Sequence, residues 1–87
     1  MNVYFTEKAQ RAYRKFPIEI KKKVDKQLHL LLQDIKHPSL NVKKMAGKEV
    51  YEARVDWHYR MVFVFDTARR AIYIVTIGQH DEGLGKK

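Results

Sequence analysis

The sequence predicts an α+β fold, in the order β-α-α-β-β-β, with a hairpin of two helices packed on one face of a mostly antiparallel sheet. Apolar residues recur at helical spacing between residues 6 and 37, and they alternate with period 2 from residue 50 onward. A short alternating segment precedes the first helix. Separate helical and strand regions are typical of α+β domains. At 87 residues the chain has room for one modest core, so we expect a single domain over residues 1–87.

The first half of the chain predicts one strand and two helices. The segment "NVYF" (2–5) alternates as a short strand does. Thr6 suits the N-cap of the helix that follows, because its hydroxyl can accept a hydrogen bond from a backbone N–H of the first turn. Pro17 ends this helix and suits the start of the next, where the N–H that proline lacks is not needed. The second helix keeps its apolar spacing until His37 and Pro38, since a proline disfavours the helical conformation in the residue before it.

The second half predicts a loop and three strands. Residues 38–49 have no regular period, and three alternating segments follow them at 50–57, 59–66 and 71–78. The apolar face of the first segment carries Tyr51, Ala53, Val55 and Trp57. The last segment is apolar on both faces, as is typical of a strand with neighbours on both sides. We therefore expect the helices to cover the apolar face of the sheet and the polar face to stay open.

The composition limits the class of function. Eighteen Lys and Arg against ten Asp and Glu give a formal net charge of +8, which favours a polyanion or an acidic protein as partner. Without cysteine, neither a disulfide framework nor a thiolate zinc site is available. The chain also lacks an apolar signal core and an apolar run of the roughly 20 residues that span a bilayer, so we expect a cytoplasmic protein without membrane contact. No glycine-rich phosphate loop or serine nucleophile motif supports nucleotide hydrolysis or acyl transfer.

The polar face of the predicted sheet brings together a carboxylate and two arginines. Alternation places Glu52, Arg54 and Arg60 on the same face of neighbouring strands, where cross-strand side chains lie about 5 Å apart. Arginine suits a phosphate because its planar fork donates two parallel hydrogen bonds and keeps its charge. A cross-strand salt bridge has the same pattern, and the residues alone leave both interpretations open.

A histidine follows the last predicted strand, in the segment "IGQHDEG" (77–83). By alternation, His80 shares a face with Ile74, Thr76 and Gly78. An extended chain would bring it to the edge of the face that holds Arg60, where an imidazole, with an unperturbed pKa of about 6.5, could protonate a leaving oxygen. The alternatives are an exposed tail histidine and a metal site. The metal site is the weaker one, because three adjacent side chains of an extended chain cannot converge on one ion.

Three segments resemble the RelE/ParE superfamily of bacterial type II toxins, specifically its RelE-like branch. They are "KKMAGKEVYEARV", "HYRMVFVFD" and "IVTIGQHDEG", and in element order the resemblance covers essentially the whole chain. It implies the RelE-like, microbial-ribonuclease-type fold. It also implies a toxin that enters the ribosomal A site and cleaves mRNA there without a metal or other cofactor. A cognate antitoxin would bind the toxin in a hetero-oligomeric complex and keep it inactive.

The resemblance also implies roles for individual residues. RelE-like toxins carry basic residues on the second strand, an arginine in "YR" and a basic residue or histidine after the terminal "G-x", which match Arg54, Arg60 and His80. Glu52 departs from the pattern, since the prototype has a lysine there, and the prototype's tyrosine beyond "G-x" has no counterpart. A carboxylate with a histidine favours acid-base chemistry, with either Glu52 or Glu49 as the general base.

Lysines near the predicted site are candidates for contacts with the RNA backbone. They are Lys22 and Lys26 on the second helix and Lys43, Lys44 and Lys48 in the loop. The neighbouring Lys21 and Lys23 also lie mostly off the apolar stripe. A solvated helix face has the same appearance, so this interpretation competes with phosphate contacts on the second helix.

Two other functions fit the same fold. The ParE branch inhibits DNA gyrase without the catalytic residues, and a catalytically weak toxin can act with its antitoxin as a DNA-binding repressor complex. The co-occurrence of Arg54, Arg60 and His80 favours the metal-independent endoribonuclease.

Overall fold

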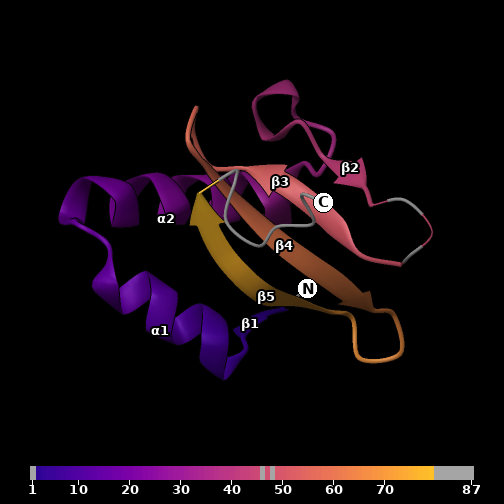
Figure 1. Cartoon of the computed structure of the whole chain (residues 1–87). Helices are drawn as coiled ribbons and strands as arrows, with labels where there is room; N and C mark the ends of the chain where they lie inside the picture. The colour runs from indigo at the N-terminus through magenta and orange to yellow at the C-terminus, as the bar shows by residue number, and fades with distance from the viewer. Residues whose placement is uncertain (1, 46, 48, 80–87) are drawn as a thin grey trace.

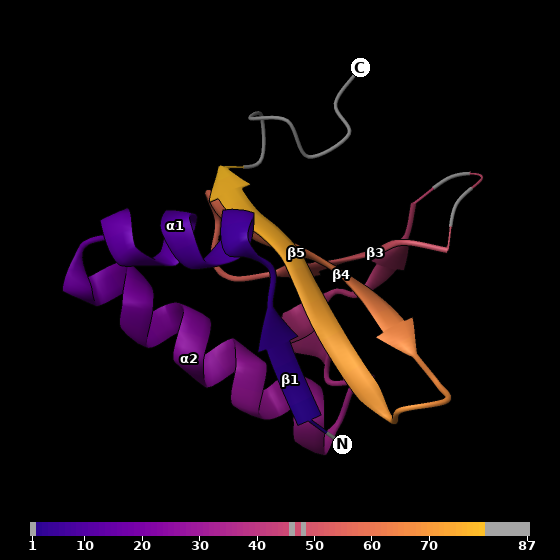
Figure 2. The same cartoon turned by 90° about the horizontal axis from the view of Figure 1, so that it is seen from below.

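The protein is described by a computed structural model that covers residues 2–45, 47 and 49–79. Its elements are β1 (Asn2–Phe5), α1 (Glu7–Lys15), α2 (Ile18–Gln33), a 3₁₀ turn (Pro38–Leu40), β2 (Lys43–Lys44), β3 (Tyr51–Arg54), β4 (Tyr59–Asp66) and β5 (Ala71–Gln79). The strands form one sheet in the order β1-β5-β4-β3-β2, in which only β1 and β5 pair parallel. Both helices lie on the same side of this sheet (Figures 1 and 2). The predicted α+β fold is confirmed.

The core lies between the helices and one face of the sheet, which we call the helix-covered face. It contains the strand residues Ala53, Met61, Phe63, Ile72, Ile74 and Ile77 and the helix residues Ala9, Val24 and Leu31. On β3 and β4 these positions follow the alternation that the sequence predicts. The opposite face, which no described helix covers and which we call the open face, carries half-buried Glu52, Arg54, Arg60, Thr76 and Gly78 and buried Val62, and pairing across the strands places them together.

A β-bulge in β5 changes the predicted alternation. Phe63 pairs with Ile74 and Val62 pairs with Thr76, so Val75 between them has no partner on β4. A single extra residue reverses which face the following side chains occupy. Ile74 is therefore buried on the helix-covered face, while Thr76 lies on the open face. The prediction that put Ile74 on the same face as Thr76 is wrong.

Thr6 stabilises both the bulge and the first helix. Its Oγ1 accepts a hydrogen bond from Ala9 N at 3.2 Å, which confirms the predicted N-cap, and donates one to the carbonyl oxygen of Val75 at 2.7 Å. Thr6 N also donates to the carbonyl oxygen of Ile74 at 3.0 Å. Thr6 thus supplies hydrogen-bond partners to backbone groups at the start of α1 and at the bulge in β5, where the regular hydrogen-bond pattern leaves such groups unpaired.

The second helix is shorter than predicted, and the loop after it is more ordered. The helix ends at Gln33, because Asp34 leaves the helical conformation and its Oδ1 accepts a hydrogen bond from Lys36 N at 3.2 Å. Such local bonds of Asp compete with helical ones. The loop then forms the 3₁₀ turn and the two-residue strand β2, which pairs antiparallel with β3.

Phe63 is expected to make one of the largest single contributions to stability. It is fully buried, and its ring lies 5.7 Å from that of Tyr51 and 5.5 Å from that of Phe65. Phe63→Ala should lower the free energy of unfolding by about 3–5 kcal/mol in urea denaturation, because it leaves a cavity as well as losing buried area. Phe63→Leu, which keeps most of the volume, should cost less than about 1.5 kcal/mol. Equal losses for the two variants would contradict this account.

Candidate functional site

The turn between β3 and β4 organises the candidate site. Val55 N and Asp56 N donate to the carbonyl oxygen of Tyr59 at 2.9 and 3.3 Å and close the turn. Asp56 Oδ1 accepts from the backbone N–H groups of His58 and Tyr59 at 2.8 and 2.9 Å. A carboxylate that bonds the backbone two residues further on is a typical turn-forming group. Residues 56–58 therefore form a tight connection between β3 and β4.

Arg54 and Arg60 stand directly opposite each other across β3 and β4, at the end of the strands next to this turn. Like charges in that relation destabilise a sheet. None of the four ion pairs among the described residues includes Arg54, Arg60 or Glu52. The described part of the chain thus gives no support to the predicted alternative of a cross-strand salt bridge. The two arginines form a concentrated positive charge, and a bound anion would reduce their repulsion.

Hydrogen bonds to the turn hold the Arg60 guanidinium. Its Nη1 donates to the carbonyl oxygens of Asp56 at 2.8 Å and of Tyr59 at 3.1 Å. The hydrogen bonds found within the described residues engage Nη1 alone. The edge formed by Nε and Nη2 therefore keeps the two parallel donors that suit a phosphate. Holding one nitrogen in place also reduces the entropy lost when a ligand binds.

The Arg54 guanidinium lies next to the turn residue Trp57. Its Nε is buried and has no hydrogen-bond partner in the described part of the structure. Its Cζ lies 5.9 Å from the ring centre of Trp57, within the range of a cation–π contact. A buried donor without a partner costs about 1–3 kcal/mol. A bound phosphate would supply the missing acceptor.

The position of Trp57 differs from the one that the sequence predicted. The sequence alternation placed it on the apolar face with Val55, but β3 ends at Arg54 and Trp57 lies in the turn, where it is 81% exposed. The hydrogen bonds of Asp56 end the strand and so end the alternation on which the prediction depended.

Asp56 also connects the turn to α2. Its Oδ2 accepts a hydrogen bond from the ammonium group of Lys23 at 3.1 Å. Partial burial alone would raise the pKa of Asp56, but the N–H groups of His58 and Tyr59 together with Lys23 outweigh burial and hold this pKa below its usual value of 3.8. The ionised carboxylate is thus the form that the turn stabilises.

This lowered pKa predicts how Asp56 affects stability. Because the folded-state pKa lies below the unfolded one, the contribution is fully present above about pH 4 and is lost as the pH falls through the folded value. Asp56→Asn should therefore lower the melting temperature at pH 7 and lower it less at pH 3. A difference in melting temperature between Asp56→Asn and the wild type that is the same at both pH values would contradict an ionic role of Asp56. Asp66→Asn, in the other hairpin, is the matched control.

The end of β5 borders Arg60. Gly78 pairs with Arg60 and Gln79 pairs with Tyr59. Gly78 therefore brings no side chain to the open face beside Arg60. His80 lies outside the described residues, so its position beside Arg60 stays a prediction. The alternative of a metal site at His80 lies outside them as well.

The two candidate bases differ in their positions. Glu52 lies on the open face of β3, two residues before Arg54, and pairs across the strands with Lys43 and Val62. The Glu49 side chain is 84% exposed, precedes β3 and forms an ion pair with Lys44 at 3.2 Å. Glu52 is therefore the better placed of the two for a reaction at the arginines.

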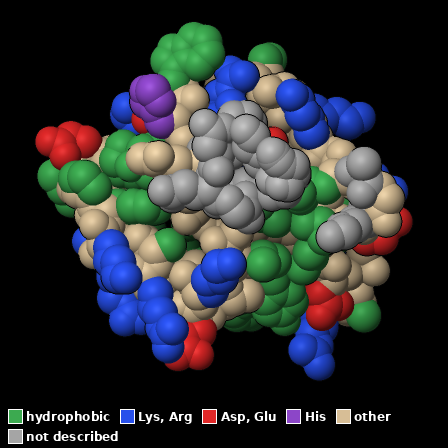
Figure 3. All heavy atoms as spheres, in the orientation of Figure 1, with side chains coloured by type: hydrophobic (Ala, Val, Ile, Leu, Met, Phe, Trp, Pro, Cys, Tyr) green, Lys and Arg blue, Asp and Glu red, His purple; other side chains and the backbone are tan. Residues whose placement is uncertain are grey.

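The predicted RNA-binding lysines occupy two regions. Lys43 and Lys44 form the exposed edge strand β2, and Lys22 and Lys26 are exposed one turn apart on α2. Of these, Lys26 lies close to Arg54, since it lines a pocket of about 320 Å³ together with Lys23, Arg54 and Asp56. Lys48 lies outside the described residues. Lys and Arg side chains occur at several places around the rim of the open face (Figure 3).

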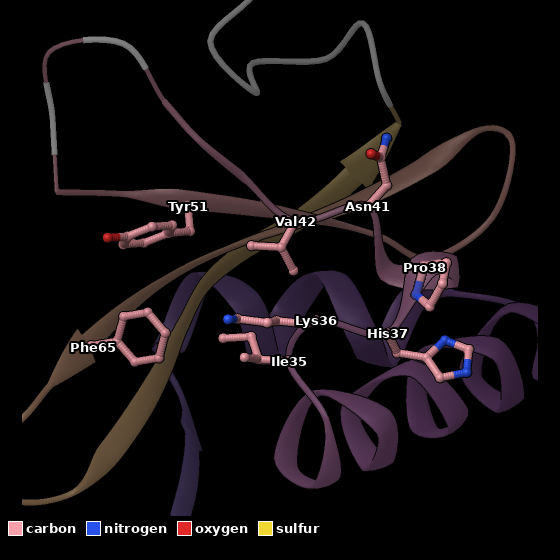
Figure 4. Close-up of a pocket in the computed structure, with 8 residues that line it drawn as sticks. All are labelled: Ile35, Lys36, His37, Pro38, Asn41, Val42, Tyr51 and Phe65. Atoms are coloured by element: carbon pink, nitrogen blue, oxygen red, sulfur yellow. The ribbon is translucent and has the colours of Figure 1, made fainter.

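A larger pocket, of about 630 Å³, lies at the opposite end of β3 and β4. Ile35, Val42 and Phe65 face the same space, with Tyr51 near Phe65 (Figure 4). Among the described residues that line it there is no carboxylate, and the one imidazole, His37, is bonded through Nδ1 to Ser39. The larger pocket is therefore an apolar groove, and the charged groups suited to chemistry on a phosphate lie at the β3–β4 turn.

Two further features can be checked in the described part of the chain. Among residues 2–45, 47 and 49–79, no group of three or more His, Asp or Glu side chains is arranged to hold a metal ion. No described helix is both long and apolar enough to cross a membrane.

The sequence alone did not assign Asp56, Lys23 or Trp57 to the site. An Asp three residues before the start of a new strand is a sequence signal for a turn. The contact of Lys23 with Asp56, by contrast, depends on how α2 packs. The fold and site together are those of a basic α+β protein whose paired arginines suit a phosphate-containing substrate.

Comparisons with known proteins identify the fold and the family. The model of the family described as phage-derived protein Gp49-like (DUF891) matches residues 4–82, and this family is RelE-like. The chain therefore belongs to the Gp49-like family and, with it, to the RelE/ParE superfamily of toxins, as the sequence predicted. A search of curated proteins gave no match.

Solved structures share the fold at low sequence identity. A YoeB/ParE toxin from Agrobacterium tumefaciens superposes with a TM-score of 0.79 at 10% identity, over 92% of this chain and 99% of that one. The structure of an archaeal RelE–RelB complex from Pyrococcus horikoshii gives 0.77 at 16% identity, over 94% and 97%. The YoeB dimer from Staphylococcus aureus gives 0.73 at 20% identity, over 92% and 97%. At these identities the likeness concerns the fold.

Proposed function

We propose that this protein is the toxin of a type II toxin–antitoxin system and that it cleaves mRNA in the ribosomal A site as a metal-independent endoribonuclease. Family membership supports the toxin role. The observation that carries the enzymatic part is the pair of opposed arginines, Arg54 and Arg60, on the open face beside the end of β5. Two guanidinium groups on paired positions of neighbouring strands suit the phosphate of a nucleic acid backbone.

The proposed reaction is an internal transfer at one phosphate. The mRNA 2′-oxygen forms a bond to the adjacent phosphorus while the bond from phosphorus to the 5′-oxygen breaks. Glu52 accepts the proton of the 2′-hydroxyl, and His80 gives a proton to the departing 5′-oxygen. Arg54 and Arg60 stabilise the extra negative charge on the phosphate oxygens, which is the contribution expected of preorganised donors. The products are a 2′,3′-cyclic phosphate and a 5′-hydroxyl end.

The lysines would supply affinity for the RNA backbone. Lys26 is near Arg54, and Lys43 lies opposite Glu52, so both are near the proposed phosphate. We assign the same role to Lys22, Lys44 and Lys48. Contacts of this kind weaken as salt rises, because bound phosphates release their counterions.

An antitoxin is the proposed protein partner, in the cytoplasm where ribosomes translate. Structures of the same fold include the RelE–RelB complex of Pyrococcus horikoshii and a YoeB–YefM heterotetramer of Staphylococcus aureus. The groove lined by Ile35, Val42 and Phe65 offers apolar surface, and the net charge of +8 complements an acidic segment. An amphipathic helix or strand would use both.

One set of assays tests the proposal. The free protein is added to translating ribosomes and the mRNA ends are mapped, while a DNA supercoiling assay with gyrase is run in parallel. Cleavage within the A-site codon, leaving 5′-hydroxyl ends, is the expected result. Inhibition of gyrase with intact mRNA would replace the proposal by a ParE-like function. If neither occurs and the protein only joins an antitoxin on operator DNA, it is a binding module.

A further inference from the structure

Trp57 is an exposed aromatic side chain that the proposed reaction does not use. It is the only tryptophan of the chain. The hydrogen bonds that shape its turn come from the backbone and from the side chains of Asp56 and Arg60, so the turn does not require an aromatic residue at its tip. Tryptophan is highly buried on average, and an exposure of 81% leaves nearly all of its apolar area in water. Stability gains little from this arrangement.

The surroundings of Trp57 are cationic. The guanidinium of Arg54 lies 5.9 Å from its ring centre, and the high exposure requires the other ring face to be open. Asp56, the residue before Trp57, lines a pocket of about 320 Å³ in which the cations Lys23, Lys26 and Arg54 outnumber this one carboxylate. An aromatic ring beside a basic groove is the arrangement that binds single-stranded nucleic acid, with bases stacked on the ring and phosphates held by the cations.

A protein partner fits this site less well. Tryptophans that anchor protein interfaces usually lie in a desolvated apolar patch. The other exposed large apolar residues described, Tyr4, Ile18 and Leu32, belong to β1 and α2, and none of them lines the pocket beside Trp57. Lysine, which protein interfaces tend to exclude, occurs here twice.

We propose that Trp57, supported by Arg54, stacks on an unpaired RNA base next to the phosphate that Arg54 and Arg60 bind. The proposal rests on the proposed ribonuclease function and deepens it. Trp57 lies in the turn three residues before Arg60, which is the second residue of β4, so the stacked base and the bound phosphate come from the same or neighbouring nucleotides. Stacking tolerates any base, since every base has a flat face, and would orient the RNA without reading its sequence.

The single tryptophan makes the proposal directly measurable. The full chain is titrated at low salt with a short 2′-O-methyl oligoadenylate, which lacks the 2′-hydroxyl and cannot be cleaved. Binding is followed by the anisotropy of a label on the RNA and by the fluorescence of Trp57. The RNA should quench this fluorescence and protect it from acrylamide. An abasic oligomer of equal charge should bind without either effect.

Variants separate stacking from general charge attraction. Trp57→Ala should weaken binding roughly 5- to 150-fold, the range expected for one stacked base, and Trp57→Phe should keep most of the affinity. Ile18→Ala, at another exposed apolar position on α2, should bind as the wild type does.

Several outcomes would overturn the stacking proposal. These are absence of RNA binding, saturable binding without a change in Trp57 fluorescence, wild-type affinity of Trp57→Ala, and a fluorescence change that occurs with an antitoxin but never with RNA. The last result would assign Trp57 to a protein interface. Because the oligomer cannot be cleaved, quenching that persists while ribosome-bound mRNA stays intact would remove the ribonuclease function and leave the stacking site standing.

Discussion

Arg60→Ala is expected to reduce single-turnover cleavage of ribosome-bound mRNA by about 10²- to 10³-fold, the loss typical of removing one preorganised donor from a transition state. Arg60 faces Arg54 across the strands and is held at Nη1 by the turn, which leaves its Nε and Nη2 edge for the phosphate. The charge on the phosphate oxygens grows as the 2′-oxygen attacks, so the lost interaction is larger in the transition state than in the bound substrate. Affinity for the ribosome, measured by co-sedimentation, should fall much less.

Two controls keep this result interpretable. Arg69→Ala removes the same charge from the hairpin at the other end of β4, where Arg69 pairs with Asp66 at 3.8 Å, and it should cleave as the wild type does. Arg60→Lys keeps the charge but loses the planar fork and should recover only part of the rate. Thermal unfolding checks that the turn survives, since Arg60 also bonds two of its carbonyl oxygens. Equal losses of rate and affinity would make Arg60 a binding residue.

The arginine pair could be predicted from the sequence because alternation is reliable within a strand that is buried on one face. Ala53 and Met61 are buried on the helix-covered face, and a shift of one residue would move them into solvent. That constraint also fixes Arg54 opposite Arg60. The same reasoning failed for Trp57, because the hydrogen bonds of Asp56 end the strand before the alternation reaches it.

Features that depend on tertiary contacts could not be predicted. The bulge at Val75 is stabilised by Thr6, which lies 69 residues earlier in the chain, and it moves Ile74 to the helix-covered face. Strand β2 has only two residues, too few for an alternating pattern, and it exists because its backbone pairs with β3. The contact of Lys23 with Asp56 likewise joins elements that only the packing of α2 brings together.

The bulge also changes how the chain leaves the sheet. Regular alternation along β5 would place Ile74, Thr76 and Gly78 on one face. In the observed register, Thr76 and Gly78 lie on the open face and Ile74 lies on the helix-covered face. Since Gly78 pairs with Arg60, the last residues of β5 lie beside Arg60, on the side where a substrate phosphate would lie. This placement of the strand end is the structural reason to test His80, two residues further along, as the proton donor.

His80→Ala is expected to slow single-turnover cleavage of ribosome-bound mRNA by about 10²- to 10⁴-fold with little change in ribosome affinity, since a general acid acts in the transition state and typically contributes that much. The matched control is His37→Ala, in the apolar groove at the far end of β3 and β4, which should cleave normally. A substrate with sulfur in place of the 5′-oxygen at the cleaved bond distinguishes proton donation from other roles. Sulfur leaves as a thiolate without needing a proton, so the variant should cleave this substrate nearly as fast as the wild type does. An equal defect on both substrates would show that His80 positions the RNA and would assign the proton to another group.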